Sequence, residues 1–174
     1  MERNQMHRQL ANMRKALFDQ GYLDEQFVQL EELQDDVNPN FVEEIVTLFY
    51  RDSTRLILNI EQALEKSSLD FSKLDTYMHQ LKGKTTSIGA IRVKNECTQF
   101  ADYCNAGNGE GCKRTFQQLK KEYSTLKKKL ETYFQVCGYL QGKLDLWRPH
   151  VAQVTDFSKG SDLAVRDWRI SIGM

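Results

Sequence analysis

The sequence predicts an all-α protein, organised as an antiparallel up-down four-helix bundle with two additional N-terminal helices. Apolar residues recur at intervals of three and four up to about residue 135, and no stretch alternates strictly between apolar and polar residues as a strand does. The 174 residues include only two prolines, Pro39 and Pro149, so long stretches can form uninterrupted helices. Four of these stretches are joined by short turns, which favours antiparallel packing between neighbours.

The two N-terminal helices are expected to pack against the bundle. The first stops near Gly21, and Asp24 can cap the start of the second. Their apolar stripes consist of Met6, Leu10, Met13 and Leu17 in the first helix, and of Phe27, Leu30 and Leu33 in the second.

The third helix should follow the break "DDVNPN" and run to about Lys66. Asn40 followed by Glu43 resembles a capping box, in which each side chain bonds a free backbone N–H of the first turn. The apolar residues available to the core are Phe41, Ile45, Phe49, Leu56, Ile60 and Leu64.

The fourth and fifth helices lie on either side of Gly89. The turn "SSLD" ends at Asp70, which can cap the fourth helix, and the glycine-rich stretch "NAGNGEG" ends the fifth. The predicted core residues are Phe71, Leu74, Met78, Leu81, Thr85 and Ile88 in the fourth helix, and Val93, Cys97 and Phe100 in the fifth.

The sixth helix has the most regular apolar stripe, and its end sets the expected domain boundary. The stripe consists of Cys112, Phe116, Leu119, Tyr123, Leu126, Leu130 and Tyr133. Beyond it, Gly138 and Gly142 would each cost about 1 kcal/mol in a helix interior. A helix continued to Trp147 would be roughly 55 Å long, against roughly 40 Å for the third helix. We therefore expect a helical bundle domain over residues 1–135 and a poorly packed or partly helical tail over 136–174.

Composition excludes several classes of protein. The formal net charge is zero, which gives no overall attraction to nucleic acid or to a membrane surface. The first ten residues carry charge from Glu2 onward and lack the apolar block of a signal peptide, and the longest apolar runs are too short to span a bilayer. The four cysteines form no C-x-x-C pair and are expected to be reduced thiols. We expect a soluble intracellular protein.

Two other patterns have plainer explanations than a binding site. The sixth helix is rich in lysine, but acidic residues are interleaved with the lysines, which favours a solvated face over a nucleic-acid surface. Cys97, Cys104 and Cys112 are spaced by seven and eight residues, which matches no standard set of zinc ligands. His7 and His150 have no companions that suggest chemistry.

The stretch "YMHQLKGKTTSIGA" (residues 77–90) places a histidine on the solvent side of the fourth helix. At about 100° per residue, His79 lies roughly 120° from the centre of the apolar stripe. Lys82 and Gly83 follow three and four residues later, so they are its neighbours on the helix surface. Thr86 continues that line, and Asp75 lies one turn before it.

This arrangement has a limited but specific chemistry. An exposed imidazole is largely neutral at cytosolic pH and can act as a nucleophile through a ring nitrogen. Lys82 could compensate the charge of a phosphoryl group, and Gly83 would leave room for a partner at a helix cost of about 1 kcal/mol. No nucleotide-binding motif accompanies the histidine, so the pattern indicates a relay rather than a kinase. A solvated helix face is the more common origin of such spacing, and spacing by itself leaves both explanations open.

A resemblance distinguishes between these explanations. "HQLKGKTTSIGA" closely resembles the phosphoacceptor motif of plant histidine-containing phosphotransfer proteins, whose usual form is HQLKGSSSSIGA. The similarity extends to "LDEQFVQLEELQDDVNPNFVEEIVTLFYRDS", to "RVKNEC" after the motif and to "EGC" before the last helix. It covers about residues 1–135.

The resemblance implies a function and a site. A monomeric bundle of this family accepts a phosphoryl group from the receiver domain of a hybrid histidine kinase and passes it to response regulators. The pathway is typically cytokinin signalling, and the protein moves between cytoplasm and nucleus. His79 would be the phosphorylated residue, with Gln80, Lys82 and Gly83 matching the motif around it. No cofactor or metal site is implied in this chain, and Mg²⁺ is expected to come with the partner receiver domain.

Two departures from the family motif leave an alternative open. Lys84 stands where the family usually has Ser, and Thr85 and Thr86 replace further serines. We expect Lys84 to add charge at the rim of a docking face that also includes Gln80, Gly83 and Thr86. The tail after residue 135 resembles no part of the family. If Lys84 or the tail spoils the geometry, the chain would be a pseudo-phosphotransfer protein, which binds receiver domains without productive transfer. Family members of that inhibitory kind have lost the histidine, which this chain retains.

Overall fold

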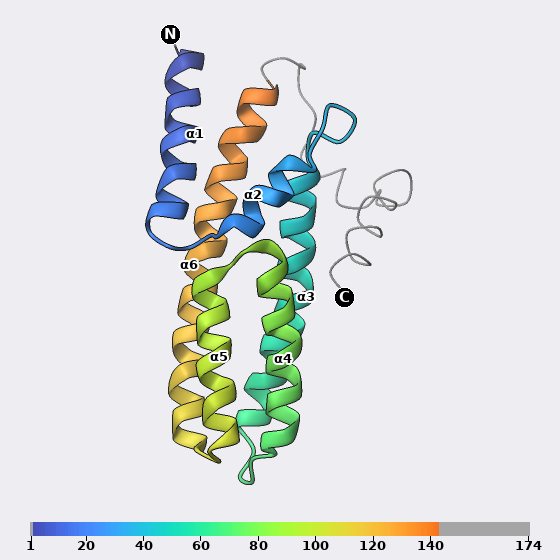
Figure 1. Cartoon of the computed structure of the whole chain (residues 1–174), viewed down its shortest axis with the longest axis vertical. Helices are drawn as coiled ribbons and strands as arrows, with labels where there is room; N and C mark the ends of the chain where they lie inside the picture. The colour runs from blue at the N-terminus through green and yellow to red at the C-terminus, as the bar shows by residue number, and fades with distance from the viewer. Residues whose placement is uncertain (1, 143–174) are drawn as a thin grey trace.

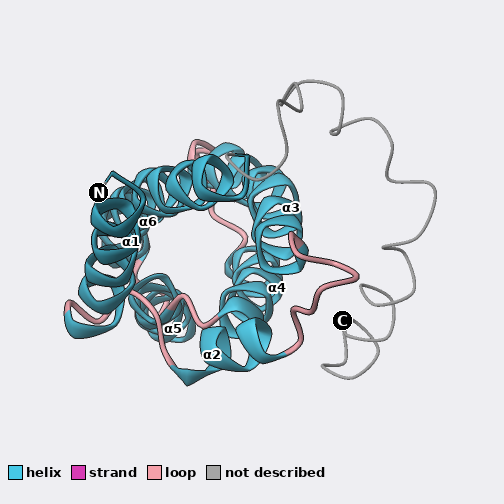
Figure 2. Ribbon diagram, turned by 90° about the horizontal axis from the view of Figure 1, so that it is seen from above, coloured by secondary structure: helices cyan, strands magenta, loops and turns pink. Residues whose placement is uncertain are grey.

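The computed structural model describes residues 2–142, which form six helices and no strand (Figure 1). The helices are α1 (Glu2–Asp19), α2 (Glu25–Glu32), α3 (Phe41–Leu64), α4 (Phe71–Ile88), α5 (Ile91–Asn105) and α6 (Gly109–Gly142). α3 to α6 form an antiparallel bundle, α1 lies alongside the upper half of α6, and α2 crosses above α4 and α5 (Figure 1). Seen from above, α3 and α5 flank α4, and α6 is diagonal to it (Figure 2). The predicted fold class is confirmed.

The core is one apolar cluster to which all six helices contribute. Its largest fully buried side chains are Phe27, Phe100, Phe116, Leu30, Ile45, Ile60, Leu74, Met78, Leu81, Ile88, Leu119 and Leu126. The predicted stripes of α3 to α6 supply most of this set. Leu33 was expected in the core but is 55% exposed, because α2 ends at Glu32 and Leu33 is its C-terminal capping residue.

Two of the three predicted N-terminal caps are present. The Asp24 carboxylate accepts from the backbone N–H of Gln26, and the Asp70 carboxylate accepts from that of Lys73. The capping box predicted at the start of α3 was wrong, because the Asn40 side chain makes no capping hydrogen bond. A more distant residue replaces it: the side-chain oxygen of Gln34 accepts from the N–H of Val42 at 3.2 Å.

The sixth helix is longer than its sequence suggested. It continues past residue 135 to Gly142, and Leu140 within the extension is buried. The expected end near residue 135 came from comparing the length of this helix with that of α3 alone. In the structure, α1 also packs against α6 and covers its upper half (Figure 1). The residues of the predicted tail from 143 to 174 lie outside the described part of the chain.

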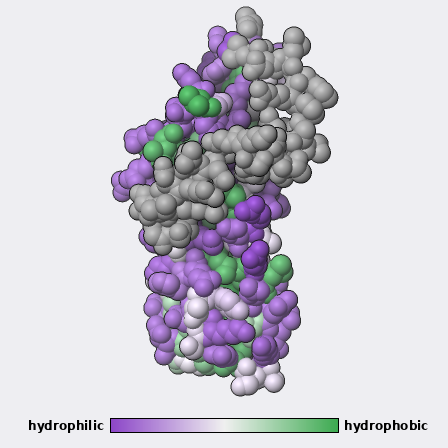
Figure 3. Space-filling model, turned by 90° about the vertical axis from the view of Figure 1, so that its right-hand side faces the viewer, coloured by the Kyte–Doolittle hydropathy of each residue, from purple (hydrophilic) through white to green (hydrophobic). Residues whose placement is uncertain are grey.

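The described residues that are visible in Figure 3 are mainly polar. In the view of Figure 3, apolar atoms are scattered rather than gathered into one patch. The large apolar side chains that are exposed over the described residues are Leu33, Val37, Leu58 and Tyr139. Across residues 2–142, no helix combines the length and apolar character needed to cross a bilayer.

Candidate functional site

The outward face of α4 carries the histidine that the sequence singled out. His79, Gly83 and Thr86 are exposed, and Lys82 is half-buried. The apolar stripe of α4 is buried on the opposite side, from Leu74 to Ile88. The helical wheel therefore placed His79 correctly, because the 3.6-residue period fixes which side of a helix faces the core.

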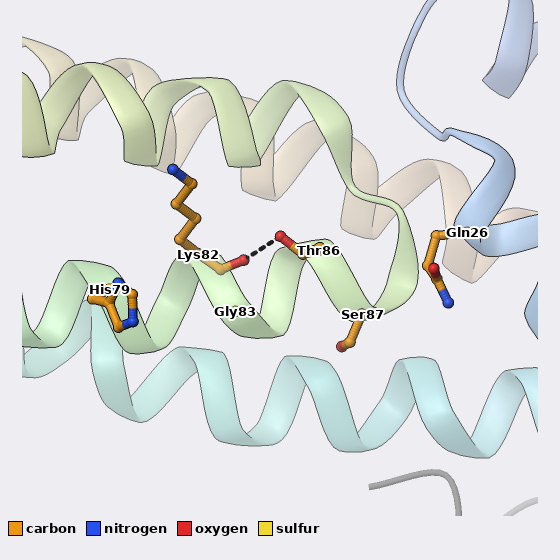
Figure 4. Close-up of a pocket in the computed structure, with 6 residues that line it drawn as sticks. All are labelled: Gln26, His79, Lys82, Gly83, Thr86 and Ser87. Atoms are coloured by element: carbon orange, nitrogen blue, oxygen red, sulfur yellow. Dashed lines mark hydrogen bonds between the residues drawn. The ribbon is translucent and has the colours of Figure 1, made fainter. Parts of the chain in front are cut away.

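A shallow depression of about 310 Å³ lies along this face (Figure 4). It is lined by Gln26, His79, Lys82, Gly83, Thr86 and Ser87. Four of these six residues were predicted from the sequence, whereas Gln26 and Ser87 were missed. Gln26 belongs to α2 and comes close because the backbone N–H of Asp24 donates to the carbonyl of Gly89 at 3.0 Å. That contact joins the start of α2 to the end of α4.

The imidazole of His79 is open to a partner. No hydrogen bond or ion pair engages it within residues 2–142, whereas the Nδ1 of His7 on α1 lies 2.8 Å from the carbonyl of Arg3. Both ring nitrogens of His79 are therefore unoccupied by side chains of the described residues, as a nucleophile requires.

Lys82 is the nearest cation along the helix surface and its charge is not neutralised by a carboxylate in the described structure. Its side chain extends from α4 towards α5, and its carbonyl accepts from the hydroxyl of Thr86 at 2.8 Å (Figure 4). The carbonyl also accepts from the hydroxyl of Thr85 at 2.8 Å. These bonds hold the turn that carries Lys82 and leave its ammonium group available.

A thiol also lies beneath this face, but its burial keeps a partner protein from reaching it. Burial raises the pKa of Cys97 to about 12, although the nearby positive charge of Lys82 acts to lower it. The Cys97 thiol is fully buried and stays protonated, so it cannot compete with the exposed imidazole.

Gly83 has no packing role among residues 2–142. A Cβ atom built at this position would find nothing within 4 Å, so the bundle leaves space there. Since glycine in a helix interior costs about 1 kcal/mol relative to alanine, the stability of the isolated chain does not explain it.

Comparison with known proteins identifies the family. The Hpt domain family matches residues 44–129, a span that contains all of α4. Histidine-containing phosphotransfer protein 4 of Arabidopsis thaliana is 68% identical over 126 residues, which cover 72% of this chain and 98% of that protein. This chain belongs to the histidine-containing phosphotransfer (HPt) family.

Other HPt relatives confirm both the resemblance and the helical bundle. The pseudo histidine-containing phosphotransfer protein 5 of Oryza sativa subsp. japonica is 58% identical over 136 residues, which cover 78% of this chain and 90% of that protein. The crystal structure of the HPt protein MtHPt2 from Medicago truncatula aligns with a TM-score of 0.76 at 46% identity, covering 79% of this chain and 94% of that one.

Lys84, which departs from the usual HPt motif, faces α3 rather than the depression. Its ammonium group lies 3.2 Å from a carboxylate oxygen of Asp52 on α3, and neither side chain is more than about a third exposed. Gln80 is exposed but does not line the depression. The HPt fold thus brings His79, Lys82, Gly83 and Thr86 together and places Lys84 and Gln80 to one side.

The described part of this HPt protein holds no cluster of three or more His, Cys, Asp or Glu residues that could bind a metal ion. Asp75, one turn before His79 along α4, is half-buried and belongs to no such cluster. The arrangement offers a nucleophile, a cation and open space.

Proposed function

We propose that His79 accepts a phosphoryl group from the receiver domain of a hybrid histidine kinase and passes it to response regulators, in cytokinin signalling. The observation that carries this proposal is an exposed imidazole beside a lysine and a bare glycine, with no ion pair to His79 or Lys82 in the described structure. Membership of the HPt family supports the same reaction class.

The proposed reaction transfers the phosphoryl group from a receiver aspartate to the imidazole. A ring nitrogen of His79 attacks phosphorus as the bond from phosphorus to the aspartyl oxygen breaks, and the carboxylate leaves. Lys82 lies on the same face and would compensate part of the charge on the transferred group. We expect Mg²⁺ held in the partner's receiver domain to neutralise the rest. The same steps in reverse pass the group to a response regulator.

The decisive experiment incubates the full chain with a phosphorylated receiver domain and Mg²⁺. We expect label on His79 that is labile to acid and stable to alkali, and transfer that stops when Mg²⁺ is chelated. A parallel incubation with ATP and no second protein should give no label, since we propose that the chain has no kinase activity. Label from ATP in the absence of a partner would overturn the proposal.

The second candidate is a pseudo-phosphotransfer protein that binds receivers without transfer. Its support is the similarity to the pseudo HPt protein of rice. The same incubation separates the two candidates, because a pseudo-phosphotransfer protein would bind the receiver and gain no label. The orientation of Lys84 towards Asp52 does not favour this candidate, since the ammonium group is held away from the depression.

We further propose a monomer that acts in cytoplasm and nucleus and binds neither nucleic acid nor membrane. The lysines of α6 support this, because several are engaged within the chain. Lys120 pairs with Glu61, and Lys129 lies 5.1 Å from the ring centroid of Tyr22. Light scattering would test the monomer, and a fluorescent fusion would test the localisation.

Replacing Lys82 with Ala should slow transfer to His79 or shorten the life of its phosphorylated form. Loss of one compensating charge corresponds to about 1 kcal/mol, or roughly a fivefold change in rate. The fold should be unaffected, because the Lys82 side chain makes no ion pair in the described structure. Single-turnover transfer kinetics measure the effect, and an unchanged rate would remove Lys82 from the site.

Replacing Gly83 with Gln should weaken receiver docking while slightly stabilising the isolated bundle. The added side chain finds open space in this chain but would occupy the surface that a receiver must approach. Gly83→Ala is the matched control, since it adds only a Cβ and should cost much less affinity. Titration calorimetry with an unphosphorylated receiver provides the measurement. Equal affinities for wild type and Gly83→Gln would show that Gly83 does not provide access.

Replacing Lys84 with Ser, the usual HPt residue, should change little. A partly exposed ion pair contributes about 0–1 kcal/mol, so the free energy of unfolding should fall by no more than that. The transfer rate should stay within roughly twofold, because Lys84 does not line the depression. Urea unfolding and transfer kinetics test both statements, and a tenfold change in rate would mean that Lys84 leaves Asp52 during the reaction.

A further inference from the structure

Two free thiols face each other across the hairpin between α5 and α6. Cys104 lies in the last turn of α5 and Cys112 in the first turn of α6. Their sulfur atoms are 3.6 Å apart, and the residues are 6% and 0% exposed. Cys97 and Cys137 are also free, and neither is paired with another sulfur in the described structure.

The backbone holds the two helices close together at this point. A Cβ atom on Gly111 would collide with the ring of Tyr103, so the approach depends on glycine. Asn108 braces the turn, since its side-chain oxygen accepts from the N–H of Gly111 at 2.9 Å. Its carbonyl accepts from the N–H of Cys112 at 3.1 Å, and its own N–H donates to the carbonyl of Tyr103 at 2.9 Å. The thiols therefore face each other because the hairpin is rigidly built.

Burial keeps both thiols mostly protonated at neutral pH. Burial, the hydrogen bond with Cys112 and the charge of Asp75 raise the pKa of Cys104 to about 12, and burial also raises the pKa of Cys112. Few thiolates form at neutral pH, so reaction should be slow and should require an oxidant small enough to reach the hairpin.

We propose that Cys104 and Cys112 form an oxidisable pair that closes an intramolecular disulfide between α5 and α6 when the protein meets hydrogen peroxide. One thiolate attacks a peroxide oxygen, hydroxide leaves, and a sulfenic acid forms. The second thiol attacks the sulfenic sulfur, the S–S bond forms, and water leaves. The two thiols lose two electrons, and one peroxide becomes two waters. A disulfide is about 2.05 Å long, so the sulfurs must approach by roughly 1.5 Å.

The disulfide would link the end of α5 to the start of α6 covalently. It would not involve His79, so this inference does not rest on the proposed function. A disulfide restricts the unfolded chain, and closing a loop of this length should raise the thermal midpoint by roughly 5 °C. The shift should reverse on reduction with dithiothreitol.

The experiment treats the full reduced chain with hydrogen peroxide, denatures it, alkylates the remaining thiols and measures the intact mass. We expect two of the four cysteines to escape alkylation, and peptide mapping should join Cys104 to Cys112. Cys104→Ala and Cys112→Ala should each abolish the cross-link. Cys137→Ala, at a half-buried position on α6, is the matched control and should retain it.

Three outcomes would overturn the proposal. These are four alkylated cysteines after peroxide treatment, a disulfide mapped to another pair or between molecules, and oxidation that stops at sulfinic acid on either residue. If the alanine variants do not fold, the peptide map of the wild-type chain decides the question by itself.

Discussion

A chain with His79 replaced by Gln should accept no phosphoryl group from a phosphorylated receiver, while its helix content and thermal midpoint stay close to those of the wild type. Glutamine keeps a polar side chain of similar size but has no basic ring nitrogen to attack phosphorus. The fold should tolerate the change because His79 is exposed and makes no hydrogen bond in the described structure. Labelling from a phosphorylated receiver, circular dichroism and thermal melting provide the measurements.

His7→Gln is the matched control for this prediction. His7 is also exposed, but it lies on α1 and not on the face that carries the depression. This variant should gain label at the wild-type rate. Receiver affinity should survive in His79→Gln, since the remaining docking surface is intact. Label on the His79 variant would place the acceptor elsewhere, and loss of its fold would mean that the imidazole has a structural role.

The sequence correctly predicted which side of α4 faces the core, because that depends only on the helical period. The side of α4 that faces the core follows from its spacing of apolar residues, so the outward placement of His79, Lys82 and Gly83 follows from the same spacing. Local reasoning also predicted the caps at Asp24 and Asp70, because N-terminal capping involves only neighbouring residues.

Apart from the end of α2 at Glu32, which exposes Leu33, the errors concern contacts between distant segments. Periodicity does not say which helix covers a stripe, so the support that α1 gives to the upper half of α6 was missed. Gln34 replaces the expected capping box at the start of α3 for the same reason. Gln26 reaches the depression from α2, whose start is joined to the end of α4 by the hydrogen bond between Asp24 and Gly89. The ion pair between Lys84 and Asp52 on α3 likewise could not be predicted from the sequence of α4.

Gly83 and Gly89 show how differently two glycines of one motif can act. Gly83 lies within α4 with open space around its missing side chain. Gly89 ends α4 with φ of +74°, in the left-handed region, and its N–H and carbonyl both bond within the junction. A Cβ atom there would collide with the Asp24 carboxylate and lie 2.9 Å from the backbone nitrogen of Phe27. The first glycine leaves a surface open, whereas the second allows two helices to meet.

Replacing Gly89 with Ala should therefore lower the free energy of unfolding by about 3 kcal/mol or more. The left-handed conformation costs an alanine roughly 1–2 kcal/mol. Displacing Asp24 would also weaken the cap of α2, which contributes about 1 kcal/mol. Relief of the contact with the backbone of Phe27 requires α2 to move as a unit, which disturbs the buried side chains of Phe27 and Leu30.

Gly83→Ala is the matched control and should move stability in the opposite direction, raising the free energy of unfolding by about 1 kcal/mol. Urea unfolding of the three chains, followed by circular dichroism, measures both changes on the same scale. The displacement of α2 should also carry Gln26 away from the depression, so Gly89→Ala should lose receiver affinity even where it remains folded. A Gly89 variant within about 1 kcal/mol of the wild type would mean that the junction between α2 and α4 relaxes at little cost, and the positioning of Gln26 would then need another explanation.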